Sequence, residues 1–271
     1  MQLRILSGLI AVAILLVVTF ADPLIFAISA SILAVMAINE LFNSFKKEGF
    51  KPLKPFGFIW CLAVPIISLQ TIYNYTLPNA GIYLAFFAST VVLFVILVFK
   101  IETTSSGDIA STVLGTIYIV LSFTSFVLIR TLHDGQFLIW IAFIGAWATD
   151  TFAYLTGIAF GKRKILPLVS PKKSLEGTVG GVIGCAIVFV VFGYINQRSF
   201  GSLNIYHIII LGSLCGIFSQ LGDWAMSAFK RKSGLKDFGK LLPGHGGVLD
   251  RFDSILFISP LIYGFLALFL K

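Results

Sequence analysis

The sequence contains a series of apolar blocks, each close to the roughly 20 residues that a helix needs to cross the hydrocarbon core of a membrane. The blocks are continuously apolar and do not alternate with a period of two, so they indicate helices and not the strands of a barrel. Hydrophobic residues make up 58% of the chain and charged residues only 12%. A chain with so few charged residues could not cover itself with the polar surface that a soluble protein needs. We therefore predict an all-α integral membrane protein.

The blocks predict a polytopic bundle of about nine transmembrane helices. We expect them at residues 5–20, 23–42, 56–73, 80–99, 108–129, 136–160, 177–195, 203–229 and 250–270. The turn FADP after the first block also resembles a signal-peptide cleavage site, and cleavage there is the alternative interpretation. No internal repeat or soluble domain is visible, so residues 1–271 are predicted to form a single membrane domain. Within it, 1–135 carries helices without motifs and 136–271 carries the candidate catalytic helices and loops.

The positive charges lie mostly on one side of the predicted bundle. Of the 20 lysine and arginine residues, all but Arg130, Arg198 and Lys271 fall on the side that holds the N-terminus. By the positive-inside rule, the N-terminus is cytoplasmic. The net charge of +8 then faces anionic lipid headgroups and cytosolic anions. Nothing in the sequence resembles a nucleic-acid-binding module, so no nucleic acid partner is expected.

Three cytoplasmic connections are long, at residues 43–55, 161–176 and 230–249. The first mixes lysines with phenylalanines, as an interfacial segment and orientation signal does. Cys61, Cys185 and Cys215 fall inside predicted spans without the spacing of metal ligands, which indicates small buried hydrophobic residues. Candidate chemistry is therefore expected around the other two connections.

The second connection follows a span that contains a carboxylate. Asp150 lies about ten residues from the cytoplasmic end of its helix, or about 15 Å along the axis, where an unpaired charge is costly. We expect it to line a polar cavity, and a pair with a lysine that holds helices together is the alternative. The loop that follows contains five basic residues, and it also contains Ser170, Ser174 and Glu176. These groups suit a polyphosphate site, although a basic cytoplasmic loop also arises from the positive-inside rule alone.

The third connection is flanked by three more aspartates. Asp223 and Lys230 lie about two turns apart on one helix, so they share a face. Asp250 and Asp253 share a face at the start of the last span. The alternative is that these two only cap the helix and compensate its dipole, and both roles are compatible because a capping carboxylate keeps lone pairs for a cation.

Together, Asp150, Asp223, Asp250 and Asp253 predict oxygen ligands for a hard divalent cation. Magnesium fits best, because one or two carboxylates plus substrate phosphates usually hold it. Zinc is disfavoured, since His245 has no cysteine beside it. The surrounding lysines and arginines would bind phosphates, and the glycines would let the backbone approach them. The residues alone thus predict phosphoryl or nucleotidyl transfer at the cytoplasmic membrane surface.

The stretch 227–253, SAFKRKSGLKDFGKLLPGHGGVLDRFD, resembles the signature of the phosphatidate cytidylyltransferase (CDP-diacylglycerol synthase) family. The matching positions are Ser227, Lys230, Arg231, Lys236, Asp237, Gly239, Leu242, Pro243, His245, Gly246, Gly247, Asp250, Arg251 and Asp253. DTFAY at 150–154 and SPKKSLEG at 170–177 are similar to two further marks of the family. The motifs cover about residues 145–253. One position departs: the family usually has an acid just before the signature serine, where this chain has Met226, so that role is vacant or relocated.

The resemblance implies the reaction of CTP with phosphatidate to give CDP-diacylglycerol and pyrophosphate, the entry to phospholipid synthesis. It also implies a homodimer in contact with membrane lipids, dependence on magnesium and a second cation, K⁺, at a paired-metal site. A bacterial plasma (inner) membrane protein with its active site facing the cytoplasm is expected.

The resemblance carries roles to individual residues of this chain. Asp223 and Asp250 are expected to hold the metal, with Asp150 and Asp253 bound to it or beside it. Positive charge at Lys172, Lys173, Lys230 and Arg231 would neutralise the triphosphate and the leaving pyrophosphate. His245 would orient or protonate a phosphate oxygen, or be structural. The remaining residues expected to bind substrate are Ser170, Ser174, Ser227, Lys236, Gly246, Gly247 and Arg251.

Two other classes of membrane protein fit the sequence less well. A transporter or lipid flippase would distribute charges near the midplane and often contain inverted repeats, whereas here the charges gather at one face. A CDP-alcohol phosphotransferase or a prenyltransferase would carry closely spaced aspartates within one helix, and the chain offers no such run.

Overall fold

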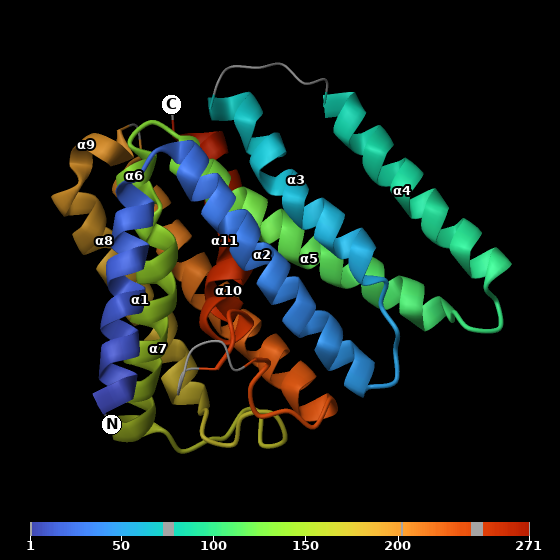
Figure 1. The fold of residues 1–271 in the computed structure, drawn as a ribbon. Coiled ribbons are helices and arrows are strands. Elements are labelled where there is room, and N and C mark those ends of the chain that lie inside the picture. The colour runs from blue at the N-terminus through green and yellow to red at the C-terminus, as the bar shows by residue number, and fades with distance from the viewer. Residues whose placement is uncertain (1, 73–78, 202, 240–245, 271) are drawn as a thin grey trace. The chain divides into compact units, whose positions relative to one another are not determined.

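The computed structural model describes residues 2–72, 79–201, 203–239 and 246–270, and these residues form helices joined by short connections (Figure 1). The helices are α1 (Gln2–Phe20), α2 (Pro23–Lys47), α3 (Lys54–Ile72), α4 (Asn79–Phe99), α5 (Ser106–Thr131), α6 (Gly135–Leu138), α7 (Trp140–Phe160), α8 (Leu175–Ile195), α9 (Gln197–Phe200), α10 (Ile205–Lys232) and α11 (Leu249–Phe269). The described ranges contain no β-strand, only an isolated bridge between Lys164 and Ser174. The all-α prediction is confirmed.

Every predicted span falls on helix, the span 136–160 on two helices, and seven helical segments are long and apolar enough to cross a membrane within the described part of the chain. They are Pro23–Lys47, Gly81–Phe99, Ser106–Thr131, Gly135–Phe160, Leu175–Ile195, Ile205–Lys232 and Leu249–Phe269. The apolar stretch of α3, Lys54–Ser68, is shorter. A multi-pass membrane protein is thereby supported, while the count of nine spans and the cytoplasmic N-terminus stay predictions.

Some helices extend beyond the predicted spans. The second continues past Phe42 to Lys47, because Ser44 and Phe45 still face the core and the lysines of the last turn compensate the helix dipole. The helix with Asp223 continues to Lys232. The predicted span 136–160 is two helices, α6 and α7, which meet at Ile139. Because α2 and α10 extend beyond their predicted spans, the connections that follow them are shorter than the sequence predicts.

The chain forms two compact units. The first comprises Met1–Val127 and Lys232–Asp250. In it, α2 packs against α3, and the buried residues of α2 include several alanines and Phe42, which is fully buried. Asp108 of α5 is also buried, and its carboxylate accepts hydrogen bonds from the backbone N–H groups of Lys51 and Ser105.

The second unit comprises Leu128–Arg231 and Arg251–Lys271. Helices α7 and α8 pack closely along most of their length. The contact depends on glycines of α8: a Cβ added at Gly177 would lie 2.8 Å from the carbonyl oxygen of Ala153, and one at Gly184 would lie 2.1 Å from Cγ of Phe152. This approach fixes α7 against the start of α8.

The cysteines are buried and free, as predicted. They pack as small apolar side chains: Cys61 lies in α3, Cys185 in α8 and Cys215 in α10. Nothing in their surroundings requires a disulfide or a metal.

The glycine contact of α8 can be tested by adding one methyl group. We expect Gly184→Ala to lower Tm, because the new Cβ meets the base of the Phe152 side chain, which cannot move away as a flexible tip could. Such overpacking costs about 1–3 kcal/mol. The matched control is Gly264→Ala in α11, where no described atom lies within 4 Å of the added Cβ. Thermal unfolding of the detergent-solubilised protein measures both, and equal Tm values for the two variants would contradict the packing described.

Candidate functional site

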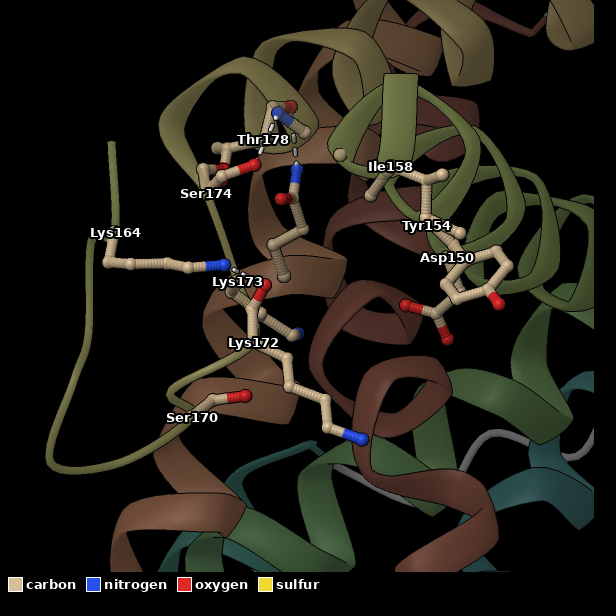
Figure 2. Close-up of a pocket in the computed structure, with 13 residues that line it drawn as sticks. Asp150, Tyr154, Ile158, Lys164, Ser170, Lys172, Lys173, Ser174 and Thr178 are labelled. Carbon is tan, nitrogen blue, oxygen red and sulfur yellow. Dashed lines mark hydrogen bonds between the residues drawn. The ribbon is translucent and has the colours of Figure 1, made fainter. Parts of the chain in front are cut away.

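A pocket of about 380 Å³ lies in the second unit, at the ends of α7 and α8 where the basic loop 161–174 joins them (Figure 2). Its wall combines cationic, hydroxyl and carboxylate side chains with the backbone of two glycines. The lining residues are Asp150, Ala153, Tyr154, Gly157, Ile158, Lys164, Ser170, Lys172, Lys173, Ser174, Gly177, Thr178 and Gln220. Three lysines against one aspartate give this wall an excess of positive charge, which suits an anionic ligand.

Helix α7 supplies one side of the pocket. Asp150, Tyr154 and Ile158 follow at intervals of one turn, so they lie on the same helical face. Figure 2 shows Asp150 and Tyr154 across the pocket from Lys164 and Ser170. The Asp150 side chain is exposed in the pocket, as expected of a carboxylate that lines a polar cavity.

The basic loop supplies the other side because it doubles back on itself. The backbone N–H of Leu175 donates to the carbonyl of Arg163 at 2.9 Å, and the ammonium of Lys164 donates to the carbonyl of Lys172 at 3.2 Å. At the start of α8, one carboxylate oxygen of Glu176 accepts the backbone N–H groups of Lys162 and Arg163, at 3.0 and 3.2 Å. The loop thus brings together lysines that lie far apart along it.

Ser174 has a structural role in the same loop. It is buried, and its hydroxyl caps α8 by accepting the N–H of Gly177 at 3.2 Å. Ser170 is less buried and lines the pocket. Gln220 of α10, which the sequence interpretation did not include, donates to the carbonyl oxygens of Thr178 and Gly216, at 3.2 and 2.9 Å.

Lys173 forms an ion pair with Asp223 of α10. About a quarter of each side chain is exposed, 28% for the lysine and 26% for the aspartate. The ammonium also lies 5.8 Å from the ring centroid of Trp224, within the range of a cation–π contact. The sequence suggested that Asp150 could pair with a lysine. In the structure, the aspartate that forms such a pair is Asp223.

Three of the four predicted aspartates gather in this unit. Asp253 of α11 is buried, its Oδ1 accepts the N–H of Ser254 at 2.7 Å, and the charges of Asp150, Asp223 and Lys230 act on it. Asp150 and Asp223 likewise lie within electrostatic range of each other. Within the described ranges, however, no group of three or more histidine, cysteine, aspartate or glutamate side chains is disposed to hold a metal ion by itself. One or two carboxylates completed by phosphate oxygens remain a suitable donor set for magnesium.

Asp250 lies in the first unit. Its Oδ2 accepts the backbone N–H groups of Phe238 and Gly247, at 2.8 and 2.9 Å. The predicted capping role is thus found in an altered form, since these donors belong to the loop before the helix and not to the helix itself.

Glu40 of α2 was missed by the sequence interpretation. It is buried in the first unit, with 9% of its surface exposed, and its two oxygens accept the N–H groups of Val248 and Leu249 at 3.1 and 2.9 Å. A signal was present, because Glu40 is a carboxylate inside a predicted apolar span, the same feature that singled out Asp150.

The other predicted residues are placed as follows. Arg231 donates through Nε to the carbonyl of Val169 at 3.4 Å, which joins the end of α10 to the basic loop. Lys230 and Ser227 are half-buried on α10, and Lys172, Lys236 and Arg251 are exposed. Gly246 has a φ of +84° and Gly247 is buried, whereas His245 lies outside the described residues.

Met226 occupies the position where the resembled signature has an acid. Its side chain is buried, with 3% exposed. An apolar side chain therefore packs at this position of α10.

Comparisons with known proteins agree with these motifs. The model of the Cytidylyltransferase family matches residues 2–269. The chain is 35% identical to a phosphatidate cytidylyltransferase of Staphylococcus haemolyticus over 262 residues, which cover 97% of each chain. It is 33% identical to that of Bacillus subtilis over 272 residues, 99% of this chain and 98% of the relative. The chain belongs to the cytidylyltransferase family.

Proposed function

We propose that this protein transfers the cytidylyl group of CTP to phosphatidate, giving CDP-diacylglycerol and pyrophosphate in phospholipid biosynthesis. The family and the names of the relatives support this activity. The observation that carries it is the lysine-lined pocket beside Asp150 and Asp223, built on helices long enough to cross a membrane. Such a pocket suits the binding of a water-soluble triphosphate beside the phosphate of a membrane lipid.

The chemistry requires positioning more than proton abstraction. An oxygen of the phosphatidate phosphate attacks the α-phosphorus of CTP. The bond from that phosphorus to the oxygen that bridges it to the β-phosphorus breaks, and that oxygen leaves with the pyrophosphate. The attacking phosphate is already an anion, so no strong general base is needed. Lys164, Lys172 and Lys173 neutralise the phosphates and the leaving pyrophosphate, and the Ser170 hydroxyl donates to a phosphate oxygen.

Magnesium is the proposed cofactor, and its donor set is the aspartates. Asp223 would hold it with Asp150 or Asp253, the carboxylates within electrostatic range, while Asp250 enters the proposal from the sequence signature. When bound, the ion neutralises negative charge on the triphosphate. Asp223 pairs with Lys173, so the carboxylate that would hold the cation lies beside an ammonium that would bind phosphate. A second cation, K⁺, and assembly as a homodimer are further parts of the proposal and follow from the family resemblance.

The site is proposed to face the cytoplasm, where CTP is available. The concentration of lysine and arginine in the connections on that side supports this orientation. The protein then lies in a bacterial plasma membrane, as the bacterial relatives suggest.

The cofactor proposal predicts that activity is lost without divalent metal. Purified protein should convert radiolabelled CTP and phosphatidate to a liponucleotide with magnesium present. Excess EDTA should abolish the product, because lysines alone leave the triphosphate incompletely neutralised, and added magnesium should restore it. Undiminished turnover in EDTA would refute the metal assignment.

The assignment of Asp223 predicts a large loss of turnover on removal of its charge. We expect Asp223→Asn to lower kcat by about 100-fold or more, the usual cost of one electrostatic contact in a phosphoryl-transfer site. Glu102→Gln, an exposed carboxylate between α4 and α5, is the control and should retain wild-type kcat. Near-normal turnover of Asp223→Asn, measured at equal folded protein, would remove this residue from the site.

The orientation of the site can be measured by cysteine labelling in intact cells. Leu168→Cys introduces a thiol in the basic loop, at a side chain that is 91% exposed, and Gln197→Cys introduces one at the exposed short helix α9. A reagent that does not cross membranes should label Cys at position 197 from outside and reach position 168 only after the cells are opened. The reverse pattern would invert the proposed topology.

A further inference from the structure

Glu40 caps a helix that begins about 200 residues later in the sequence. Its carboxylate accepts hydrogen bonds from the N–H groups of Val248 and Leu249, at the start of α11. The first N–H groups of a helix have no partner within the helix. Val248, the residue before α11, has an apolar side chain and cannot supply one. The cap therefore comes from α2, and the aligned dipoles of α11 favour the negative charge there.

Asp250 binds the same turn from another direction. It accepts the N–H of Gly247, so the three consecutive amides of residues 247, 248 and 249 donate to two carboxylates, Asp250 and Glu40. The two negative charges act on one another. The backbone N–H groups between them satisfy both carboxylates, the partly buried Asp250 and the buried Glu40, for which an unpaired charge would be costly.

Two glycines of the signature give Glu40 its room. A Cβ added at Gly239 would lie 2.2 Å from Glu40 Oε1, and one added at Gly247 would lie 2.3 Å from the same oxygen. Both values are below 3.0 Å, a distance that real Cβ atoms essentially never show. The loop before α11 therefore rests directly on the carboxylate of Glu40.

We propose that Glu40 is a positioning residue for the transfer reaction, because its carboxylate holds the turn at 247–249 and thereby the orientation of Asp250. The inference rests on the proposed function, in which Asp250 belongs to the site. Glu40 itself touches no substrate. Its effect reaches the reaction through the backbone of Gly247, which bonds to Asp250 and lies against Glu40.

Asp108 offers a matched comparison within the same unit. It is buried to a similar degree, and its carboxylate also accepts two backbone N–H groups, that of Lys51 in the connection before α3 and that of Ser105 just before α5. Its turn contains no residue of the signature. Neutralising Asp108 thus removes comparable bonds and leaves the turn of Asp250 in place.

The first experiment compares Glu40→Gln with Asp108→Asn at temperatures well below the Tm of both variants. We expect Glu40→Gln to lower kcat by about 10–100-fold, the usual effect of removing a residue that orients a ligand. KM for CTP should change little, since the lysines that would bind it are untouched. Asp108→Asn should lower Tm but keep kcat per folded molecule. Wild-type kcat in Glu40→Gln, or an equal loss in both variants, would overturn the proposal.

A second measurement does not depend on activity. Hydrogen exchange of the Val248 and Leu249 amides should be faster in Glu40→Gln than in the wild type, and unchanged in Asp108→Asn. Unchanged exchange in Glu40→Gln would overturn the proposal. If the wild-type protein forms no liponucleotide, the proposed function fails, while this measurement still decides whether Glu40 holds the turn.

A double-mutant cycle tests the same contact from the loop side and serves where a Glu40 variant folds poorly. Gly239→Ala pushes a methyl group into Glu40, so we expect kcat to fall by about tenfold in the wild-type background. In the Glu40→Ala background the obstructing carboxylate is gone and the contact that remains is with Cα of Gly247 at 3.0 Å, so Gly239→Ala should cause a smaller further loss. Equal losses in both backgrounds would show that Gly239 acts independently of Glu40 and would contradict the inference.

Discussion

The structure depends on how carboxylates are accommodated inside an apolar helical protein. Burial of an ionised group without a partner is costly, so each buried acid needs a cation or a set of N–H donors. The partly buried Asp223 has the ammonium of Lys173, Glu40 has the amides of Val248 and Leu249, and Asp108 has the amides of Lys51 and Ser105. These requirements connect the loops and the helix starts to particular acids.

The basic loop follows the same logic with the opposite charge. Its lysines converge because Glu176 holds the backbone at Lys162 and Arg163 and the loop returns to form the start of α8. The glycines of α8 let α7 approach, so Asp150 and the lysines border one pocket. Close packing of two apolar helices thus determines where the polar groups meet.

Much of the fold and part of the site could be predicted from the sequence. Continuous apolarity predicted the positions of the helices. The isolated carboxylate of Asp150 predicted a polar cavity, and Asp150 lines the pocket. The ion pair of Lys173 with Asp223 could not be foreseen, because helical periodicity relates residues on one helix and says nothing about which loop residue meets which helix. The bonds of Glu40 to residues 248 and 249 were missed for the same reason, although its charge in an apolar span was visible.

The contact of Glu40 with Gly239 and Gly247 changes how the glycines of the signature are understood. From the sequence, glycine there suggested room for phosphate, whereas in the structure the room is filled by a side chain from the second helix. The tolerance of these positions to substitution is then set by a residue outside the motif. Grafting the segment 227–253 alone into another helical scaffold would transfer the motif without the acid that its turn requires. An engineered version of this turn has to include α2 as well.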